Sequence, residues 1–301
     1  MKAVLLKGYG GLDQLVYGDA PDPNPHSGEV LVKVAATSIN PVDWKIRHGD
    51  VKATMPVKFP AILGRDVAGI VVSLGPETEG FQPGDRVMGL VNRAYAEFLV
   101  AKSEDLTRIP DGLEIEDAAA LPLVLTTGAQ LIEEGVRPKA GETVLITGAL
   151  GNVGRTAVYV AKRHGMAVFA GVRGRERAEA ESLGTDRVIA IDEEQGIASL
   201  GHVDAIADTV GHEVIEKLMA YIRHGGVLAS VLGKPRGADG KDFHLRQVWA
   251  HPDAKRLQQL ALAVANGEFS IPIARRMKLS QAAEAQQLAE KGGISKILLI
   301  P

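Results

Sequence analysis

One stretch near the middle of the chain, TVLITGALGNVG at positions 143–154, constrains the fold more than any other. Its first half, Thr143–Thr147, is a short apolar run of the kind that forms a buried parallel strand. A glycine turn follows, and Asn152–His164 then carries apolar residues at helical spacing until Gly165 ends the pattern. A strand, a glycine turn and a helix in this order predict a βαβ unit whose helix N-terminus faces a phosphate group.

The glycines of this turn lie where a dinucleotide needs bare backbone. Gly151 would let the main chain approach a pyrophosphate, and Gly154 would let the helix pack closely on the strand. The first glycine of the usual fingerprint is replaced by Ala149, and similar turns occur in α/β proteins that bind nothing, so a purely structural role stays open at this point. The predicted cofactor contacts in the turn are Gly148, Ala149, Gly151, Asn152, Val153 and Gly154.

The next strand pattern, Ala167–Val172, ends in arginines. An enzyme that prefers NAD usually places a carboxylate there, on the ribose hydroxyl. Here the chain continues with Arg173 and Arg175, whose guanidinium groups suit bidentate phosphate contacts. We therefore expect NADPH to be favoured over NADH, although at least one of the nearby arginines is expected only to cover an exposed helix turn. Further cofactor contacts are expected where later parallel strands end, at Val210, Gly211, Leu232 and Gly233.

Composition excludes several classes of protein. The 301 residues are enough for two domains, and a net charge of −3 gives no basic surface for nucleic acid or an anionic membrane. Cysteine is absent, and the eight histidines form no metal-binding pair, so we expect no metal site.

No membrane span or secretion signal is expected. The longest apolar stretch, around Ala118–Leu125, contains Pro122 and is shorter than the roughly 18 residues that a spanning helix needs. The N-terminal apolar run is too short for a secretory signal, which predicts a cytoplasmic protein.

The pattern of predicted secondary structure changes near Ile115. The first third is β-rich and divided by Gly and Pro turns, which predicts an antiparallel, barrel-like domain. The following part alternates helices with short strands, which predicts a doubly wound parallel sheet. Within it, Val227–Leu232 is interpreted as an apolar edge strand that would pair with a second copy, so a homodimer is expected.

Several motifs, in order over almost the whole chain, resemble the medium-chain dehydrogenase/reductase superfamily, in its zinc-independent quinone oxidoreductase (zeta-crystallin-like) branch. They are Ser38–Lys45 (N-P-x-D-x-K), Pro60–Val71 (P-x-x-x-G-x-D-x-A-G-x-V), Gln82–Val87 (G-D-R-V), Ala119–Thr127 (A-L-P…L-T) and Ser295–Leu298 (G-K-x-V-L). The resemblance implies a GroES-like substrate domain (1–117 and 270–301) and a Rossmann NADP-binding domain (118–269).

This chain departs from the superfamily pattern at the positions where zinc-dependent relatives carry their metal ligands. Zinc-dependent relatives carry G-H-E where this chain has Gly64, Arg65 and Asp66, and a cysteine ligand in the Ser38–Asp43 region. The four-cysteine lobe expected after Val100 is also missing. We expect Arg65 and Asp66 to form a structural ion pair in place of the metal.

The resemblance also implies site residues. Asn40, Asp43 and Lys45 are the candidate catalytic residues, although Asp43 could organise its loop and Lys45 could be a solvated loop residue. Trp44 and Leu63 are candidate substrate contacts, with core packing the favoured interpretation of Trp44. Thr126 and Lys296 are expected to contact the cofactor.

The predicted activity is reduction of quinones by hydride transfer from NADPH, without a metal, in a cleft between the domains. The first alternative is an NADPH-dependent reductase of alkenals and enones, whose α,β-unsaturated carbonyls also leave negative charge on oxygen when they accept hydride. The alternative from another class is a non-catalytic NADPH sensor or structural protein.

Overall fold

The computed structural model describes residues 1–301, and the chain divides into two compact units. The first unit comprises Met1–Leu123 and Pro252–Pro301, and the second comprises Val124–His251. Helix α8 (Ala254–Ala265) contacts β6 (Arg86–Leu90) and β8 (Leu106–Arg108), so it belongs to the first unit, whereas the predicted Rossmann domain, 118–269, included it. The discontinuous organisation itself was expected.

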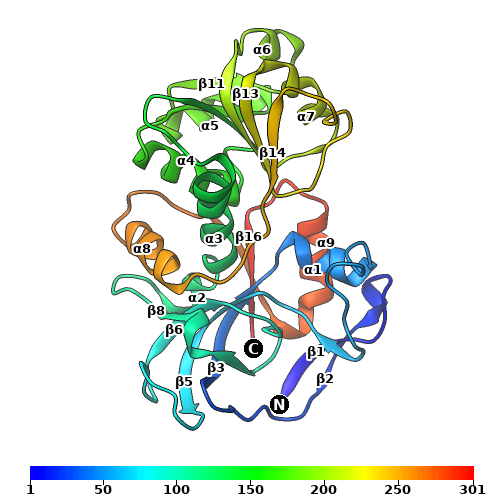
Figure 1. Ribbon diagram of the computed structural model, residues 1–301. Coiled ribbons are helices and arrows are strands. Elements are labelled where there is room, and N and C mark those ends of the chain that lie inside the picture. The colour runs from blue at the N-terminus through cyan, green and yellow to red at the C-terminus, as the bar shows by residue number, and fades with distance from the viewer. The chain divides into compact units, whose positions relative to one another are not determined.

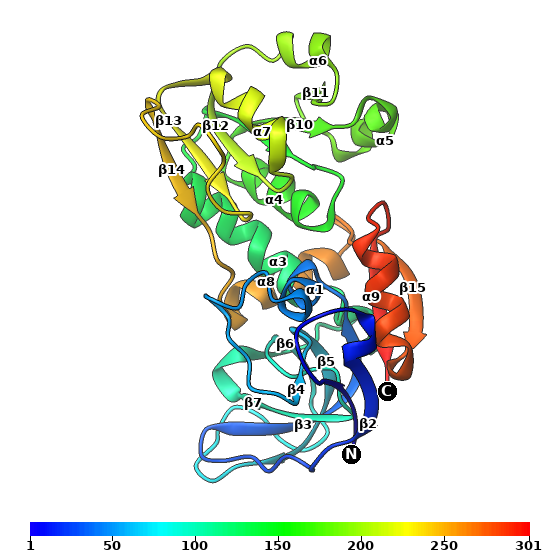
Figure 2. The ribbon, with the colours of Figure 1, turned by 90° about the vertical axis from the view of Figure 1, so that its right-hand side faces the viewer.

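The first unit is built on antiparallel strands around β3 (Glu29–Ser38), as Figures 1 and 2 show. Every second residue of β3 from Val30 to Val34 is buried, which is the period that the sequence predicts. Two register shifts between β3 and β5 bend the strand, as curvature of a barrel requires. The remaining strands of this unit are β1 (Lys2–Leu6), β2 (Leu15–Asp19), β4 (Ala61–Ile62), β5 (Asp66–Leu74), β7 (Phe98–Lys102), β15 (Ile273–Lys278) and β16 (Lys296–Ile300).

The C-terminal strand joins this sheet. Strand β16 lies between β15, which is parallel to it, and β3, which is antiparallel, and Leu298 pairs with Ser38. This pairing places the start of β16 beside the end of β3, although the two strands are far apart in sequence. The helices of the unit are α1 (Pro41–His48), α2 (Ile115–Ala118), α8 and α9 (Ala282–Glu290).

Helix α1 was not predicted. At its start the Asp43 carboxylate accepts a hydrogen bond from the Asn40 backbone N–H, as in a capping box, and Pro41 occupies the first helical position. The helix ends at Gly49, whose φ of 85° is left-handed. All the signals are present in the sequence, but eight residues in a β-rich segment give little helical periodicity.

The second unit is a six-stranded sheet in the order β11-β10-β9-β12-β13-β14, with every pairing parallel. This confirms the doubly wound sheet. Its strands are β9 (Thr143–Thr147), β10 (Ala167–Val172), β11 (Arg187–Ala190), β12 (Val203–Asp208), β13 (Ile222–Ser230) and β14 (Phe243–Gln247). Its helices are α4 (Asn152–Arg163), α5 (Arg177–Ala180), α6 (Glu194–Ala198) and α7 (His212–Leu218).

The interpretation of Val227–Leu232 as an edge strand is wrong. Strand β14 pairs along β13, with Val227 opposite His244, so β13 is internal. Strand β14 was not predicted from the sequence because it is short, is half polar and follows a loop rich in glycine and charged residues. The expectation of a homodimer therefore loses its basis, because it depended on β13 being an edge strand.

The apolar helical stretch is also longer than predicted. Residues Ile115–Val136 comprise α2, α3 (Pro122–Gln130) and a π-helix (Leu131–Val136), and by length and composition alone they could cross a membrane. Pro122 does not interrupt the stretch because it occupies the first turn of α3, where proline is tolerated. In its most apolar window 78% is buried inside the structure, as in the core helix of a folded domain.

Candidate active site

A buried polar cluster lies where α1 begins. The Oδ2 atom of Asp43 accepts hydrogen bonds from the Asn40 backbone N–H and from the Tyr95 hydroxyl, each at 2.8 Å. At most 1% of each of the three residues is exposed. Asn40 and Asp43 were predicted as site residues, whereas Tyr95 was missed because nothing in the sequence links it to α1.

Asp66, the first residue of β5, is the acceptor at the centre of the cluster. Its Oδ2 atom accepts from Asn40 Nδ2 at 2.7 Å, from the Ser38 hydroxyl and from Lys296 Nζ at 3.0 Å. Its other oxygen accepts from the Leu123 backbone N–H at 2.6 Å. The carboxylate is therefore fully satisfied, as a buried charge must be.

The expected ion pair between Arg65 and Asp66 is wrong. Asp66 pairs with Lys296, and the acidic group that attracts Arg65 is Asp105. Successive side chains of an extended segment point to opposite sides, so neighbours such as these two cannot readily share a buried site.

Lys296 enters this cluster from β16. Its ammonium donates to Ser38 Oγ and Asn40 Oδ1 at 2.7 Å each, besides Asp66. All three protons of the ammonium thus have an acceptor. The predicted role of Lys296 as a cofactor contact stays a prediction, but its charge is already bound by its own unit.

Burial raises the pKa of two side chains of the cluster, Asp43 and Tyr95. Desolvation raises the pKa of Asp43 from 3.8 to about 6, against the bonds from Tyr95 and Asn40, which lower it. Burial and the nearby carboxyl of Asp43 raise the pKa of Tyr95 well above its usual value. The Oδ1 atom of Asp43 is buried without a hydrogen-bond partner, so one side of this carboxyl is free to act on another group.

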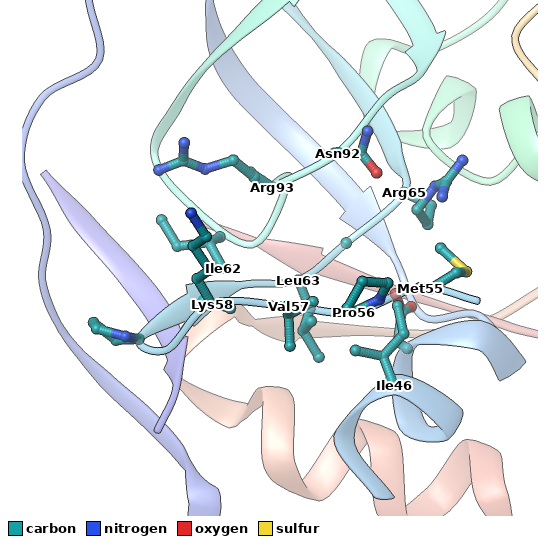
Figure 3. A pocket seen from close by; sticks show the side chains of 14 residues that line it. Ile46, Met55, Pro56, Val57, Lys58, Ile62, Leu63, Arg65, Asn92 and Arg93 are labelled. Atoms are coloured by element: carbon teal, nitrogen blue, oxygen red, sulfur yellow. The ribbon is translucent and has the colours of Figure 1, made fainter. Parts of the chain in front are cut away.

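A pocket of about 430 Å³ opens beside the cluster, within the first unit (Figure 3). The predicted residues Asp43 and Leu63 line it. The other lining residues are Ile46, Met55, Pro56, Val57, Lys58, Pro60, Ala61, Ile62, Gly64, Arg65, Asn92 and Arg93. A pocket of this size suits a small organic molecule.

Two predicted residues lie outside the pocket. Trp44 packs against the apolar core formed by α1, β1 and α9, which agrees with the core interpretation of this residue. Lys45 is half-buried on α1, has no hydrogen bond or ion pair from its side chain and does not line the pocket. The structure therefore brings Asn40 and Asp43 together with Lys296, and not with Lys45.

In the second unit, the glycine turn fits a phosphate group. A Cβ atom on Gly154 would lie 2.1 Å from the Gly148 carbonyl oxygen, so α4 can pack this closely only with glycine there. Gly148 itself has a left-handed φ of 64°. Gly151 caps α4 and leaves the first N–H groups of a twelve-residue helix facing outward, as a phosphate cradle requires. The buried methyl of Ala149 is accommodated, so the missing first glycine does not disturb the turn.

Asp208 holds the neighbouring strand ends together, which the sequence did not reveal. Its Oδ1 atom accepts from the Thr147 hydroxyl and the Gly211 N–H at 2.9 Å each and from the Val210 N–H at 3.1 Å. Its Oδ2 atom accepts from Ser230 Oγ at 2.8 Å. One buried carboxylate thus fixes the ends of β9, β12 and β13, where Val210 and Gly211 were predicted to flank the cofactor.

The other predicted cofactor residues differ in whether their side chains already have a hydrogen-bond partner within the protein. Arg173 is held by Glu176, with Nε 2.8 Å from the carboxylate, whereas the exposed Arg175 has no ion pair or hydrogen bond from its side chain. The hydroxyl of Thr126 is buried without a partner, as a group that awaits a ligand would be. Leu232 and Gly233 follow the carboxyl end of β13.

The residues present do not fit a zinc ion. No three His, Cys, Asp or Glu side chains are grouped as metal ligands anywhere in the chain. The buried oxygen acceptors on Ser38, Asn40 and Asp66 already bind the ammonium of Lys296. Zinc prefers thiolate and imidazole, and neither type of ligand is present there.

Comparison with known proteins agrees with this architecture. The alcohol dehydrogenase GroES-like domain matches residues 26–111, and the zinc-binding dehydrogenase domain matches residues 183–295. Mouse quinone oxidoreductase is 31% identical over 245 residues, which cover 75% of this chain and 71% of the mouse protein. The quinone-oxidoreductase homolog of spinach chloroplasts is 37% identical over 199 residues, 63% of this chain and 60% of the spinach protein, so the chain spans less than two thirds of that relative.

A solved structure agrees over the full length. The quinone oxidoreductase of Coxiella burnetii has a TM-score of 0.90 at 28% identity and covers 100% of this chain and 99% of its own. The two-unit fold, with a glycine turn in its parallel sheet, is that of a family of oxidoreductases that use a nicotinamide cofactor. The chain belongs to the medium-chain dehydrogenase/reductase family and, within it, to the quinone oxidoreductases.

Proposed function

We propose that this protein reduces quinones with NADPH and without a metal ion. The observation that carries the proposal is the Lys296 ammonium, which is bound by the three buried acceptors of the cluster and leaves no donor set for zinc. The names of the mouse and Coxiella burnetii relatives support quinones as the substrate class.

The cofactor, when bound, supplies the hydride. The groups of the chain that would hold it are the N-terminus of α4 and the strand ends fixed by Asp208. Arg175 supports NADPH over NADH because its guanidinium is unpaired at the position where a 2′-phosphate would be recognised.

The reduced quinone oxygen needs a proton, and Asp43 is our candidate to supply or relay it. The carboxyl lines the pocket, its Oδ1 atom has no partner, and its raised pKa of about 6 lets it take up and release a proton closer to neutral pH than an ordinary carboxyl does. Asn40 and Tyr95 hold the carboxyl in place, while Lys296 holds Asn40.

The test is steady-state oxidation of NADPH with a quinone and with an alkyl vinyl ketone, with NADH in parallel and a metal chelator present. The proposal expects quinone-dependent oxidation that prefers NADPH and ignores the chelator. A preference for the enone would replace it by an alkene reductase, and NADPH binding without turnover on any acceptor would indicate a sensor.

A further inference from the structure

The walls of the pocket have two chemical characters. In Figure 3 the side chains of Ile46, Val57 and Leu63 lie on one side, whereas Arg93 and Asn92 lie on the other. Lys58 lies near Arg93 in this view, and Arg65 extends at the opposite end. The pocket therefore offers an apolar surface for a ring system next to a cationic rim.

The cations of the rim are not neutralised within the pocket, and the acidic group that attracts Arg65, Asp105, does not line it. Lys58, Arg65 and Arg93 form no salt bridge, whereas other arginines of the chain, such as Arg155, do. Asp43 is the one acidic residue in the lining, and it is already bound by Tyr95 and Asn40. Charge in the pocket is thus unbalanced toward positive.

Arg65 is the most constrained of these cations. It is half-buried, and its Nε atom is fully buried without an acceptor. A buried donor without an acceptor is rare, because it loses its hydrogen bond to water, and a bound ligand is one partner that completes it. Arg93 adds a second sign of constraint, because its φ of 66° is left-handed, a strained conformation for a residue other than glycine.

We infer that the pocket takes a small conjugated ring compound that carries a carboxylate, with the ring on the apolar wall and the carboxylate on Arg65. This inference rests on the proposed function, since it makes the physiological acceptor an acidic quinone or enone. The exposed Arg93 and Lys58 add long-range attraction, and Arg65 supplies the short contact.

Binding without cofactor tests the inference separately from turnover. The titration uses 2-naphthoate and its neutral counterpart 2-naphthamide, followed by calorimetry on the intact chain. A charge-assisted hydrogen bond is worth about 1.5–3 kcal/mol, so the naphthoate is expected to bind roughly ten- to a hundredfold more tightly.

Two substitutions locate the effect. Arg65→Gln is expected to abolish the preference for the carboxylate, and Arg65→Lys, which keeps the charge, to retain part of it. The control is Lys33→Gln, which removes an exposed charge on β3 outside the pocket and should change nothing. Equal affinities for the two ligands, or an unchanged preference in Arg65→Gln, would overturn the inference.

Two further outcomes distinguish this anion site from a site for a cofactor phosphate, and distinguish a failure of the inference from a failure of the proposed function. If NADPH displaces the naphthoate and Arg65→Gln weakens both alike, the arginine binds a cofactor phosphate and the inference fails. If the naphthoate preference holds but no quinone or enone is reduced, the anion site stands and the proposed function fails.

Discussion

The ammonium of Lys296 and the carboxylate of Asp66 lie 3.0 Å apart, with 2% and 0% of their side chains exposed. The pair joins the first residue of β16 to the first residue of β5 and is completed by Ser38 and Asn40. A charge buried this deeply is stable only while its partner is present.

Replacing Lys296 by Met should therefore destabilise the first unit by about 3–5 kcal/mol, because Asp66 would be left as an uncompensated buried charge. The double variant Lys296→Met/Asp66→Asn should lose less than Lys296→Met alone. Urea denaturation of the three proteins measures this difference, and a double variant less stable than Lys296→Met would show that the two charges are not coupled.

Gly154→Ala should damage cofactor binding more than folding. The added Cβ atom meets the Gly148 carbonyl at 2.1 Å, which forces α4 away from the turn that it shares with the phosphate groups. Overpacking of this kind typically costs about 1–3 kcal/mol, and we expect the Kd for NADPH to rise at least about tenfold.

Fluorescence titration of NADPH measures the effect. The matched control is Gly18→Ala on β2, where a Cβ atom meets nothing within 4 Å, and its Kd should not change. Equal affinities of the two variants would contradict the role given to the glycine turn.

Asp43 should make stability depend on pH with a defined sign. Because burial raises the pKa of its folded form from 3.8 to about 6, the native state holds this proton more tightly than the unfolded chain does. The contribution is therefore present below the unfolded pKa and is lost as pH rises through about 6, a change of about 3 kcal/mol at most.

Asp43→Asn keeps an oxygen acceptor for Tyr95 and for the Asn40 N–H but removes the titration. Relative to the natural chain, the variant should gain stability between about pH 4 and pH 7. Thermal unfolding across this range measures the gain, and a stability difference that does not vary with pH would show that the carboxyl titrates normally.

Arg175→Ala should weaken the preference for NADPH, because this guanidinium is free to bind the 2′-phosphate. We expect kcat/KM for NADPH to fall about ten- to a hundredfold, while that for NADH stays unchanged. Arg173→Ala should have the smaller effect, since Glu176 already holds Arg173. A larger loss in Arg173→Ala than in Arg175→Ala would reverse these assignments.

Local patterns predicted most of the second unit. The bounds of β9, β10 and β12 follow from short apolar runs, and α4 follows from its helical spacing and the glycines before it. Such elements are specified by neighbouring residues, so one sequence suffices to locate them.

The errors at the candidate site concern relationships between distant residues. The partner of Asp66 is 230 positions away, and it reaches Asp66 only because β16 pairs with β3. Tyr95 contacts Asp43 across 52 positions, and Asp208 contacts Thr147 across 61 positions. Long-range pairing of this kind leaves no periodic signal in the chain, whereas Asn40 and Asp43 were found because both belong to one short motif.

The most direct test of metal-free quinone reduction is an anaerobic measurement of stoichiometry on protein whose metal content has been determined. The account predicts one hydroquinone formed for each NADPH oxidised, by protein that contains no bound zinc. Turnover that appears only when zinc is restored, or no turnover with any quinone, would contradict it.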